Sequence, residues 1–190
     1  MIQRGFSLLE IMISSFILAL GLLGLAGMQS TAVKSSVEIQ QRTLANSLLS
    51  DISERMQLNK GWLKQTGNSY AINSLIDAEL TQPDCIGSGG VFVNCSGEDV
   101  KNNDLYEWKD KFIGAHVVSA TGIESGLIGA DACIEADSTG KSMIVLSWYS
   151  TVKSLDAAID SGSTSLSFKC GEASLHRRQL SVQTYISKSS

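Results

Sequence analysis

The residues that suggest chemistry lie at the amino terminus, where Arg4 to Glu10 read R-G-F-S-L-L-E. An uncharged run from Ile11 to Met28 follows directly. In a secretory signal the small-residue cleavage site comes after the apolar stretch, which is then discarded. Here the small residue, Gly5, comes before that stretch. A cut after Gly5 would remove residues 1–5 and leave Phe6 as the first residue of a hydrophobic helix that stays with the protein.

Glu10 is the second feature with chemical meaning, because a carboxylate at the edge of a hydrocarbon segment is costly and usually marks function. The amino group freed at Phe6 would be positive and would lie at the positive end of a helix dipole, so a nearby carboxylate would offset both charges. Glu10 and Phe6 are one helical turn apart, which allows a pair within one chain. A pair between neighbouring chains fits the sequence equally well.

These residues resemble the type IV pilin and pseudopilin superfamily, in which a glycine, a phenylalanine, a small hydroxyl residue and a glutamate occur in this order before an apolar run. The resemblance implies that an inner-membrane prepilin peptidase cuts after Gly5 and methylates the amino group of Phe6. It also implies that Glu10 is the helix glutamate that pairs with the amine of the next subunit. Two alternatives are a secretory signal cut after Ala26 and an uncleaved single-pass anchor.

Length and composition predict one folded domain behind this anchor. The chain has 190 residues and a formal charge of -4, which argues against a uniformly basic, nucleic-acid-binding surface. The expected parts are a leader at 1–5, a hydrophobic transmembrane and assembly helix at 6–33, the amphipathic half of the same helix at 34–60, and a globular periplasmic or extracellular head at 61–190.

The helix is predicted to continue past the apolar run, because apolar residues recur at helical spacing among polar ones. The stripe consists of Val37, Leu44, Leu48, Ile52 and Met56. Asn59-Lys60-Gly61 gives a stop signal, with a basic residue followed by glycine. Gly21, Gly24 and Gly27 indicate either a place to bend or close packing of membrane helices.

The last third of the chain is predicted to form strands, at 112–118, 132–136, 142–152, 165–170 and 176–187. The last segment alternates apolar and polar residues with the period of a half-buried strand. Residues 62–112 are polar without a sustained period, so we expect an irregular connection with one short helix near 72–80. The predicted fold is α+β, with an antiparallel sheet against the second half of the long helix. This is also the pilin fold that the resemblance implies.

Four cysteines, Cys85, Cys95, Cys133 and Cys170, lie in the part expected outside the cytoplasm, where disulfides form. Of the three possible pairings we favour Cys85 with Cys95, which bracket a glycine-rich turn, and Cys133 with Cys170, which would join two strands. A zinc site is the rival, but the chain has no C-x-x-C pair and its two histidines, His116 and His176, are isolated. No metal or other cofactor is expected.

Catalysis is not expected, because no G-x-S-x-G or Ser-His-Asp arrangement occurs. His176, Arg177 and Arg178 form a basic cluster, read either as a solvated strand edge or as a contact for DNA or an acidic neighbour. Trp62, Trp108 and Trp148 are expected in the core or on a sheet face. Trp108, which lies among charged residues, also suggests an exposed contact.

Within the superfamily the chain most resembles a PilV-type minor pilin of a type IVa pilus, through G-L-L-G-L-A-G-M-Q after the anchor, D-I-S-E-R-M-Q-L-N at the helix end, and a cysteine-containing sheet with tryptophan. The resemblance implies that such proteins join other minor pilins and the major pilin at the inner-membrane assembly platform, with a possible tip adhesin. They prime or cap the fibre and support adhesion, twitching motility and sometimes DNA uptake.

The implied location is the bacterial inner membrane, as a single-pass protein with its head in the periplasm, and then the pilus at the cell surface. A type II secretion pseudopilin and a membrane-anchored periplasmic binding module are the two alternatives. The pseudopilin shares the anchor and the processing. The binding module would never polymerise, so it would not need Glu10 for function.

Overall fold

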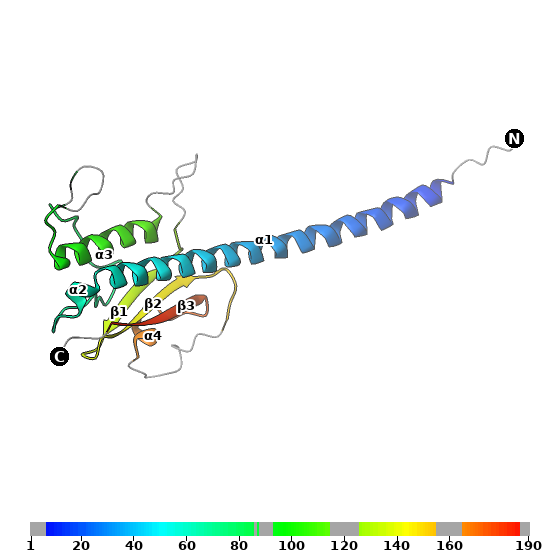
Figure 1. Cartoon of the computed structure of the whole chain (residues 1–190). Helices are drawn as coiled ribbons and strands as arrows, with labels where there is room; N and C mark the ends of the chain where they lie inside the picture. The colour runs from blue at the N-terminus through cyan, green and yellow to red at the C-terminus, as the bar shows by residue number, and fades with distance from the viewer. Residues whose placement is uncertain (1–6, 86, 88–92, 115–125, 155–164, 187–190) are drawn as a thin grey trace. The chain divides into compact units, whose positions relative to one another are not determined.

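A computed structural model describes residues 7–85, 87, 93–114, 126–154 and 165–186. The elements in chain order are α1 (Leu8–Leu58), α2 (Lys60–Leu63), α3 (Gly97–Ile113), β1 (Asp131–Ala136), β2 (Lys141–Tyr149), α4 (Leu166–Lys169) and β3 (Arg177–Tyr185) (Figure 1). The chain divides into two units, Met1–Gln40 and Gln41–Ser190. The last part of α1 belongs to the second unit, where it packs on an antiparallel sheet. The predicted α+β fold is confirmed.

The part of α1 in the second unit buries one face, because its apolar residues recur at intervals of three and four. The buried side chains are Ala45, Leu48, Leu49, Ile52 and Met56. Leu44 beside them is half-buried. The predicted stripe is therefore confirmed from Leu44 onward, whereas Val37, in the first unit, is exposed. α1 ends at Leu58, within two residues of the predicted stop.

The sheet has three antiparallel strands in the order β1-β2-β3. Its register pairs Ile134 with Ile144 across β1 and β2, and Leu146 with Leu180 across β2 and β3. Alternate side chains point to opposite faces of a sheet. One face packs against α1 and α3 through a core that includes Ile144 and Leu146. The other face packs against α4 through Val145 and other buried residues.

The turn between β1 and β2 forms where the sequence places Ser138-Thr139-Gly140. The carboxylate of Asp137 accepts hydrogen bonds from the backbone N–H groups of Thr139 at 2.9 Å and Lys141 at 3.0 Å. Gly140 has a positive φ of 96°, which a residue without a Cβ adopts at little cost. These local preferences fix the hairpin and therefore the register of β1 on β2.

Helix α3 corrects the expectation that residues 62–112 are irregular. Ser96 caps its first turn, since its side chain accepts a hydrogen bond from the backbone N–H of Asp99 and the Asp99 carboxylate bonds back to the Ser96 N–H. Gly114 ends the helix in the left-handed conformation at φ 76°. The buried apolar residues Leu105, Trp108 and Phe112 share one face. The capping box and this spacing are the sequence signals that indicate the helix.

Two further expectations about secondary structure are wrong, at 72–80 and 165–170, and a third, the strand at 112–118, is contradicted only at 112–114, the part of it that the structure describes. Residues 72–80 form no helix: Ile72 exchanges two backbone hydrogen bonds with Ile134 of β1, and Asp131 accepts from the N–H groups of Leu75 and Ile76. The segment expected as a strand at 112–118 begins with the end of α3, and the rest of it lies outside the described residues.

The segment 165–170 contains the short helix α4 rather than a strand. Leu166 and Cys170 are both buried, and helical i, i+4 spacing rather than strand alternation places them on one face.

Candidate assembly segment and head sites

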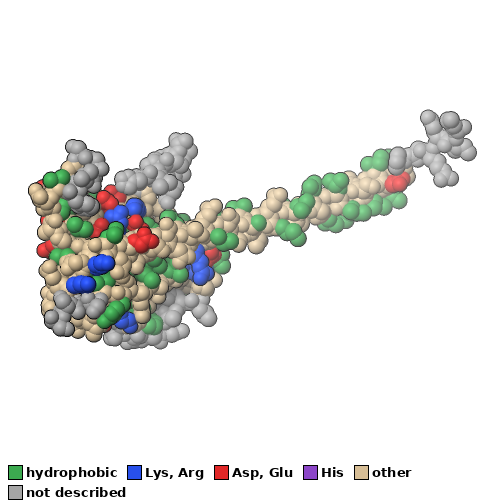
Figure 2. Space-filling view, in the orientation of Figure 1, with side chains coloured by type: hydrophobic (Ala, Val, Ile, Leu, Met, Phe, Trp, Pro, Cys, Tyr) green, Lys and Arg blue, Asp and Glu red, His purple; other side chains and the backbone are tan. Residues whose placement is uncertain are grey.

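The helix of the first unit is uncharged and mostly apolar from Ile11 to Val33, and it has no buried face there. All of its side chains from Ser7 to Val37 are exposed, and hydrophobic side chains occur along this part of α1 (Figure 2). α1 is the one helix in the described part of the chain that is long and apolar enough to cross a membrane. It stays helical through Gly21, Gly24 and Gly27, where an added Cβ would meet nothing within 4 Å. A surface of this kind needs lipid or other helices around it.

Glu10 lies in the first turn of α1, where a carboxylate interacts favourably with the helix dipole. Its backbone N–H donates to the Ser7 carbonyl at 3.0 Å, and its own carbonyl accepts from the Ser14 hydroxyl at 2.7 Å. Its exposed carboxylate makes no ion pair with any residue that the structure describes. Gly5 and Phe6, the expected cleavage and methylation sites, lie outside the described residues.

In the second unit, α1 and α3 are joined by a polar cluster centred on Arg55. Its guanidinium donates to Asp51 at 3.2 Å on its own helix, and to Asp104 at 3.0 Å and Glu107 at 2.9 Å on α3. Asp104, which is 5% exposed, also accepts a 2.6 Å hydrogen bond from the Tyr70 hydroxyl. The cluster surrounds the buried Asp104 carboxylate with ion-pair and hydrogen-bond partners. Without them, a buried carboxylate would strongly destabilise the fold.

The pKa values of this cluster shift in different directions. Burial raises the pKa of the Asp104 carboxyl, although the hydrogen bonds from Tyr70 and Arg55 oppose the change. Burial and then the hydrogen bond to Asp104 raise the pKa of Tyr70 far above its ordinary value. For Glu107, burial also acts upward, but hydrogen bonds from Asn103 and Arg55 and nearby positive charges outweigh it and lower the pKa. These groups are arranged to hold two helices together.

Two disulfides join Cys85 to Cys95 and Cys133 to Cys170, which is the pairing favoured from the sequence. The Cys133–Cys170 bridge is fully buried and connects β1 to the end of α4. Asp131, Cys133 and Cys170 are the one group of possible metal-ligating side chains close together in the described residues. Because both sulfurs are bonded to each other, they are not available as thiolate ligands.

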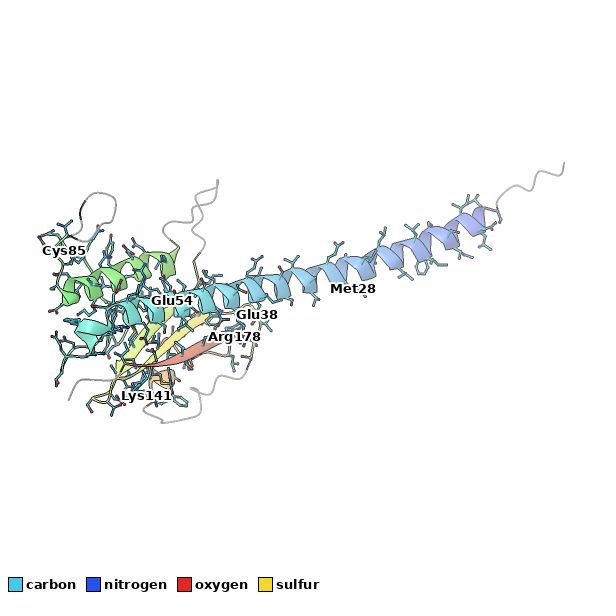
Figure 3. All side chains as sticks on the ribbon, in the orientation of Figure 1. Met28, Glu38, Glu54, Cys85, Lys141 and Arg178 are labelled. Atoms are coloured by element: carbon cyan, nitrogen blue, oxygen red, sulfur yellow. A yellow bond between two sulfur atoms is a disulfide. The ribbon has the colours of Figure 1, made fainter. Side chains whose placement is uncertain are left out.

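The basic cluster at the start of β3 binds the protein's own backbone. Arg177 is 5% exposed and donates to the carbonyls of Cys170 at 3.0 Å and Gly171 at 3.4 Å. Arg178 projects from β3 and donates to the Val152 carbonyl at 2.8 Å (Figure 3). The expectation of a solvated strand edge is wrong for Arg177. Its buried guanidinium connects β3 to the segment that follows α4 through hydrogen bonds.

The three tryptophan side chains lie in the core of the head or pack against it. Trp148 is buried and Trp62 is half-buried, as expected. Trp108 is fully buried and its indole N–H donates to the Leu48 carbonyl at 3.0 Å, so the expectation of an exposed contact there is wrong. The charged neighbours of Trp108 in the sequence lie on other faces of α3.

Comparison with known protein families gives a match at the amino-terminal segment. Residues 1–26 match the family model of the prokaryotic N-terminal methylation motif, and this range contains Gly5, Phe6 and Glu10. The motif is the processing signal of type IV pilins and pseudopilins, so the match indicates a pilin-like or pseudopilin protein. No curated protein and no solved structure matches the chain.

Proposed function

We propose that the chain is a minor subunit of a type IV pilus that is cut after Gly5, methylated on Phe6 and assembled through its amino-terminal helix. The observation that carries the proposal is the methylation motif at residues 1–26. It continues into a helix in which Glu10 is the only charged residue between Ser7 and Val33.

The helix would act first as a membrane anchor. Ile11–Val33 supplies 23 uncharged residues, and about 20 residues suffice to cross the hydrocarbon core. The chain is then a single-pass protein of the inner membrane with its head in the periplasm, where disulfides form and persist. Cleavage and methylation by the prepilin peptidase would take place on the cytoplasmic side of this anchor.

Glu10 would make assembly of the subunits favourable in free energy. A carboxylate at the edge of the membrane core is costly without a partner, and the described residues offer it none. The methylated amine of Phe6 on a neighbouring subunit would neutralise it as the helices pack together. The partners are accordingly other minor pilins and the major pilin, brought together at the inner-membrane assembly platform.

The role of a primer or cap, and the PilV-type subtype, rest on the resemblance of residues 21–29 and 51–59 to such minor pilins. A subunit of this kind supports adhesion, twitching motility and, in some systems, DNA uptake. The buried position of Arg177 and the net charge of -4 do not favour DNA binding by the head itself.

The proposal is tested by Glu10→Gln, which removes the charge and keeps the size of the side chain. We expect surface pili to fall several-fold while the processed protein remains in the membrane. Ser15→Ala, a change on the same exposed helix, is the control and should leave pili unchanged. Normal pilus numbers with Glu10→Gln would contradict a role in assembly and favour an anchored binding module.

A type II secretion pseudopilin is the second candidate, because the same motif at residues 1–26 occurs in that class. Deletion of the gene separates the two. Loss of surface pili supports the pilus subunit, whereas loss of secreted enzymes with normal pili assigns the chain to the secretion system.

A further inference from the structure

The two edges of the sheet differ in how they are covered. On the β1 side, Ile72 exchanges backbone hydrogen bonds with Ile134, and the Leu75 N–H donates to the Ala132 carbonyl at 2.9 Å. That edge is therefore occupied by the protein's own chain. β3 forms the opposite edge, and no strand of the described chain pairs with its outer side.

The outer backbone groups of β3 can be identified from its pairing with β2. The Ile186 N–H donates to the Gly140 carbonyl at 2.9 Å, so the even-numbered residues of β3 direct their backbone groups toward β2. Ser181, Gln183 and Tyr185 consequently direct theirs outward, and all three are exposed. No hydrogen bond to the backbone N–H of Ser181 or Gln183 is made within the described part of the chain.

This edge lacks the features that usually prevent pairing with another chain. Edge strands are commonly protected by charge, proline, bulges or shortness. β3 has nine residues, and the stretch from Gln179 to Ile186 contains neither a charged residue nor a proline. Its sequence, Q-L-S-V-Q-T-Y-I, is rich in residues that favour strands.

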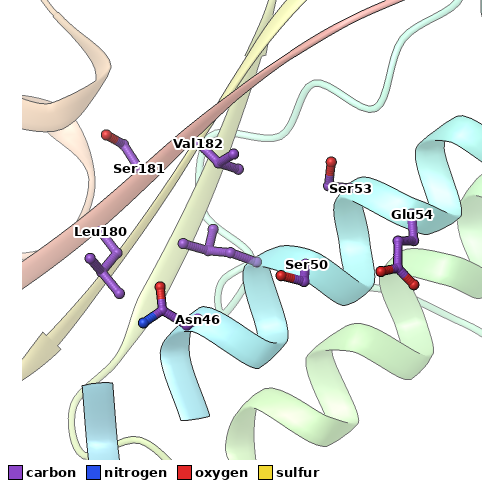
Figure 4. Close-up of a pocket in the computed structure, with 8 residues that line it drawn as sticks. Asn46, Ser50, Ser53, Glu54, Leu180, Ser181 and Val182 are labelled. Atoms are coloured by element: carbon purple, nitrogen blue, oxygen red, sulfur yellow. The ribbon is translucent and has the colours of Figure 1, made fainter. Parts of the chain in front are cut away.

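A groove of about 310 Å³ lies between β3 and the flank of α1 (Figure 4). Leu49, Leu180 and Val182 form its apolar lining, and small polar residues of α1, among them Ser50 and Ser53, leave it open. One turn further along, Gln57 donates to the Thr184 hydroxyl at 2.8 Å and ties α1 to β3. A strand added to the β3 edge would extend the sheet so that alternate side chains enter this groove.

The charge at the groove points to a basic partner. Glu54 lines the groove and is exposed, and its carboxylate makes no ion pair within the described residues. The nearby Asp51 is neutralised by Arg55 and Lys111. In a two-fold pairing of β3 with a second copy, both helices α1 would lie over the same face of the joined sheet, which would place two unpaired Glu54 carboxylates on that face. A different subunit with a lysine or arginine avoids this accumulation of negative charge.

We propose that the β3 edge accepts an extended segment of another protein, which adds a fourth strand, places apolar side chains in the groove and brings a lysine or arginine to Glu54. Backbone hydrogen bonds supply the affinity in such strand addition, and the side-chain pockets supply the specificity. The site goes beyond the proposed pilus function and does not depend on processing at Phe6.

The test uses the purified full-length protein in detergent micelles and a fluorescent eight-residue peptide that alternates valine and threonine around one lysine. Ser181→Pro removes an outward N–H at an edge position where proline is tolerated, and it should weaken binding at least about tenfold. Ser181→Thr keeps the N–H, so it is the matched control and should bind as the wild type does. Glu54→Gln should abolish the preference for lysine over glutamate in the peptide.

Two backbone-methylated peptides test the edge without changing the protein. One carries N-methyl groups on its valines and the other on its threonines, so only one of them blocks the N–H groups that face β3. We expect one peptide to lose binding and the other to keep it. Equal binding of the two peptides, no binding by the parent peptide at millimolar concentration, or unchanged binding by Ser181→Pro would overturn strand addition. Self-association of the wild type that Ser181→Pro removes would overturn the choice of a foreign partner.

Discussion

The indole N–H of Trp108 donates to the backbone carbonyl of Leu48 at 3.0 Å, which links α3 to α1 across 60 positions of sequence. The indole is fully buried and lies beside Phe112, with ring centroids 5.9 Å apart. This contact, the Arg55 cluster and the ion pair between Lys111 and Asp51 at 3.1 Å position α3 on the long helix. Helix α3, which lies between α1 and the sheet in the sequence, is therefore part of the packed head.

Trp108→Phe should destabilise the head, because it removes a buried hydrogen bond and leaves unfilled volume. We expect a loss of about 2 kcal/mol in the free energy of unfolding. Trp62→Phe is the control, since Trp62 is half-buried and its indole packs at an edge against Tyr70. Guanidinium unfolding followed by near-ultraviolet circular dichroism measures both. Equal losses in the two variants would contradict a special role for the Trp108 bond.

Arg55→Met should also destabilise the head, since it leaves Asp104 buried without its guanidinium partner. Removing one member of such a pair costs about 3 kcal/mol when the site is buried, and partial exposure of Arg55 reduces this to about 2 kcal/mol. The control is Arg42→Met, because Arg42 is exposed on the same helix. The same unfolding measurement should show little change for Arg42→Met, and a similarly small change for Arg55→Met would refute the role of the cluster.

Acid should weaken the head in part through Glu107. Its pKa is lowered in the folded state, so its contribution is present above the pKa of the unfolded chain and is lost as the pH falls through the folded value. Asp104 acts in the opposite sense, because its raised pKa makes the folded state favour the protonated form. Between about pH 5 and pH 3, Glu107→Gln should lose less stability than the wild type. Parallel pH profiles for the two proteins would be inconsistent with this assignment.

The two disulfides should contribute unequally. Cys133–Cys170 spans a sequence separation of 37 and Cys85–Cys95 one of 10. Loop-closure entropy then gives about 4 kcal/mol for the first bridge and about 3 kcal/mol for the second. The double variant Cys133→Ala/Cys170→Ala also opens a cavity in the core, so its unfolding free energy should fall further than that of Cys85→Ala/Cys95→Ala. The reverse order would show that loop length and burial do not govern these bridges.

The sequence predicts the features of this fold that depend on local pattern. The stripe on α1 and the alternation in β3 follow from periods of 3.6 and 2 residues. Cysteine spacing, with an expected extracytoplasmic location, leads to the disulfide pairing found in the structure. The motif from Gly5 to Glu10 is recognisable because its order is fixed before an apolar run.

The expectations that are wrong concern segments in which contacts distant in sequence outweigh local conformational preference. The buried face of α3 carries Asn103 and Asp104 among its apolar residues, which obscures the helical period in the sequence. Hydrogen bonds from Arg55 and Tyr70, which are distant in sequence, reduce the cost of burying Asp104. The segment near Ile72 pairs with β1 through an isolated antiparallel bridge between Ile72 and Ile134. Nothing local to Arg177 indicates that its guanidinium lies inside the protein, because its acceptors belong to the segment after α4.

Processing of the amino-terminal segment into an assembly helix is tested most directly by the mass of the amino-terminal peptide from protein isolated from native membranes or sheared fibres. Cleavage after Gly5 and methylation should give a peptide that begins at Phe6 and carries one added methyl group. A peptide that begins at Gly27, or one that retains Met1, would contradict this processing and leave the head as an ordinary secreted or anchored domain.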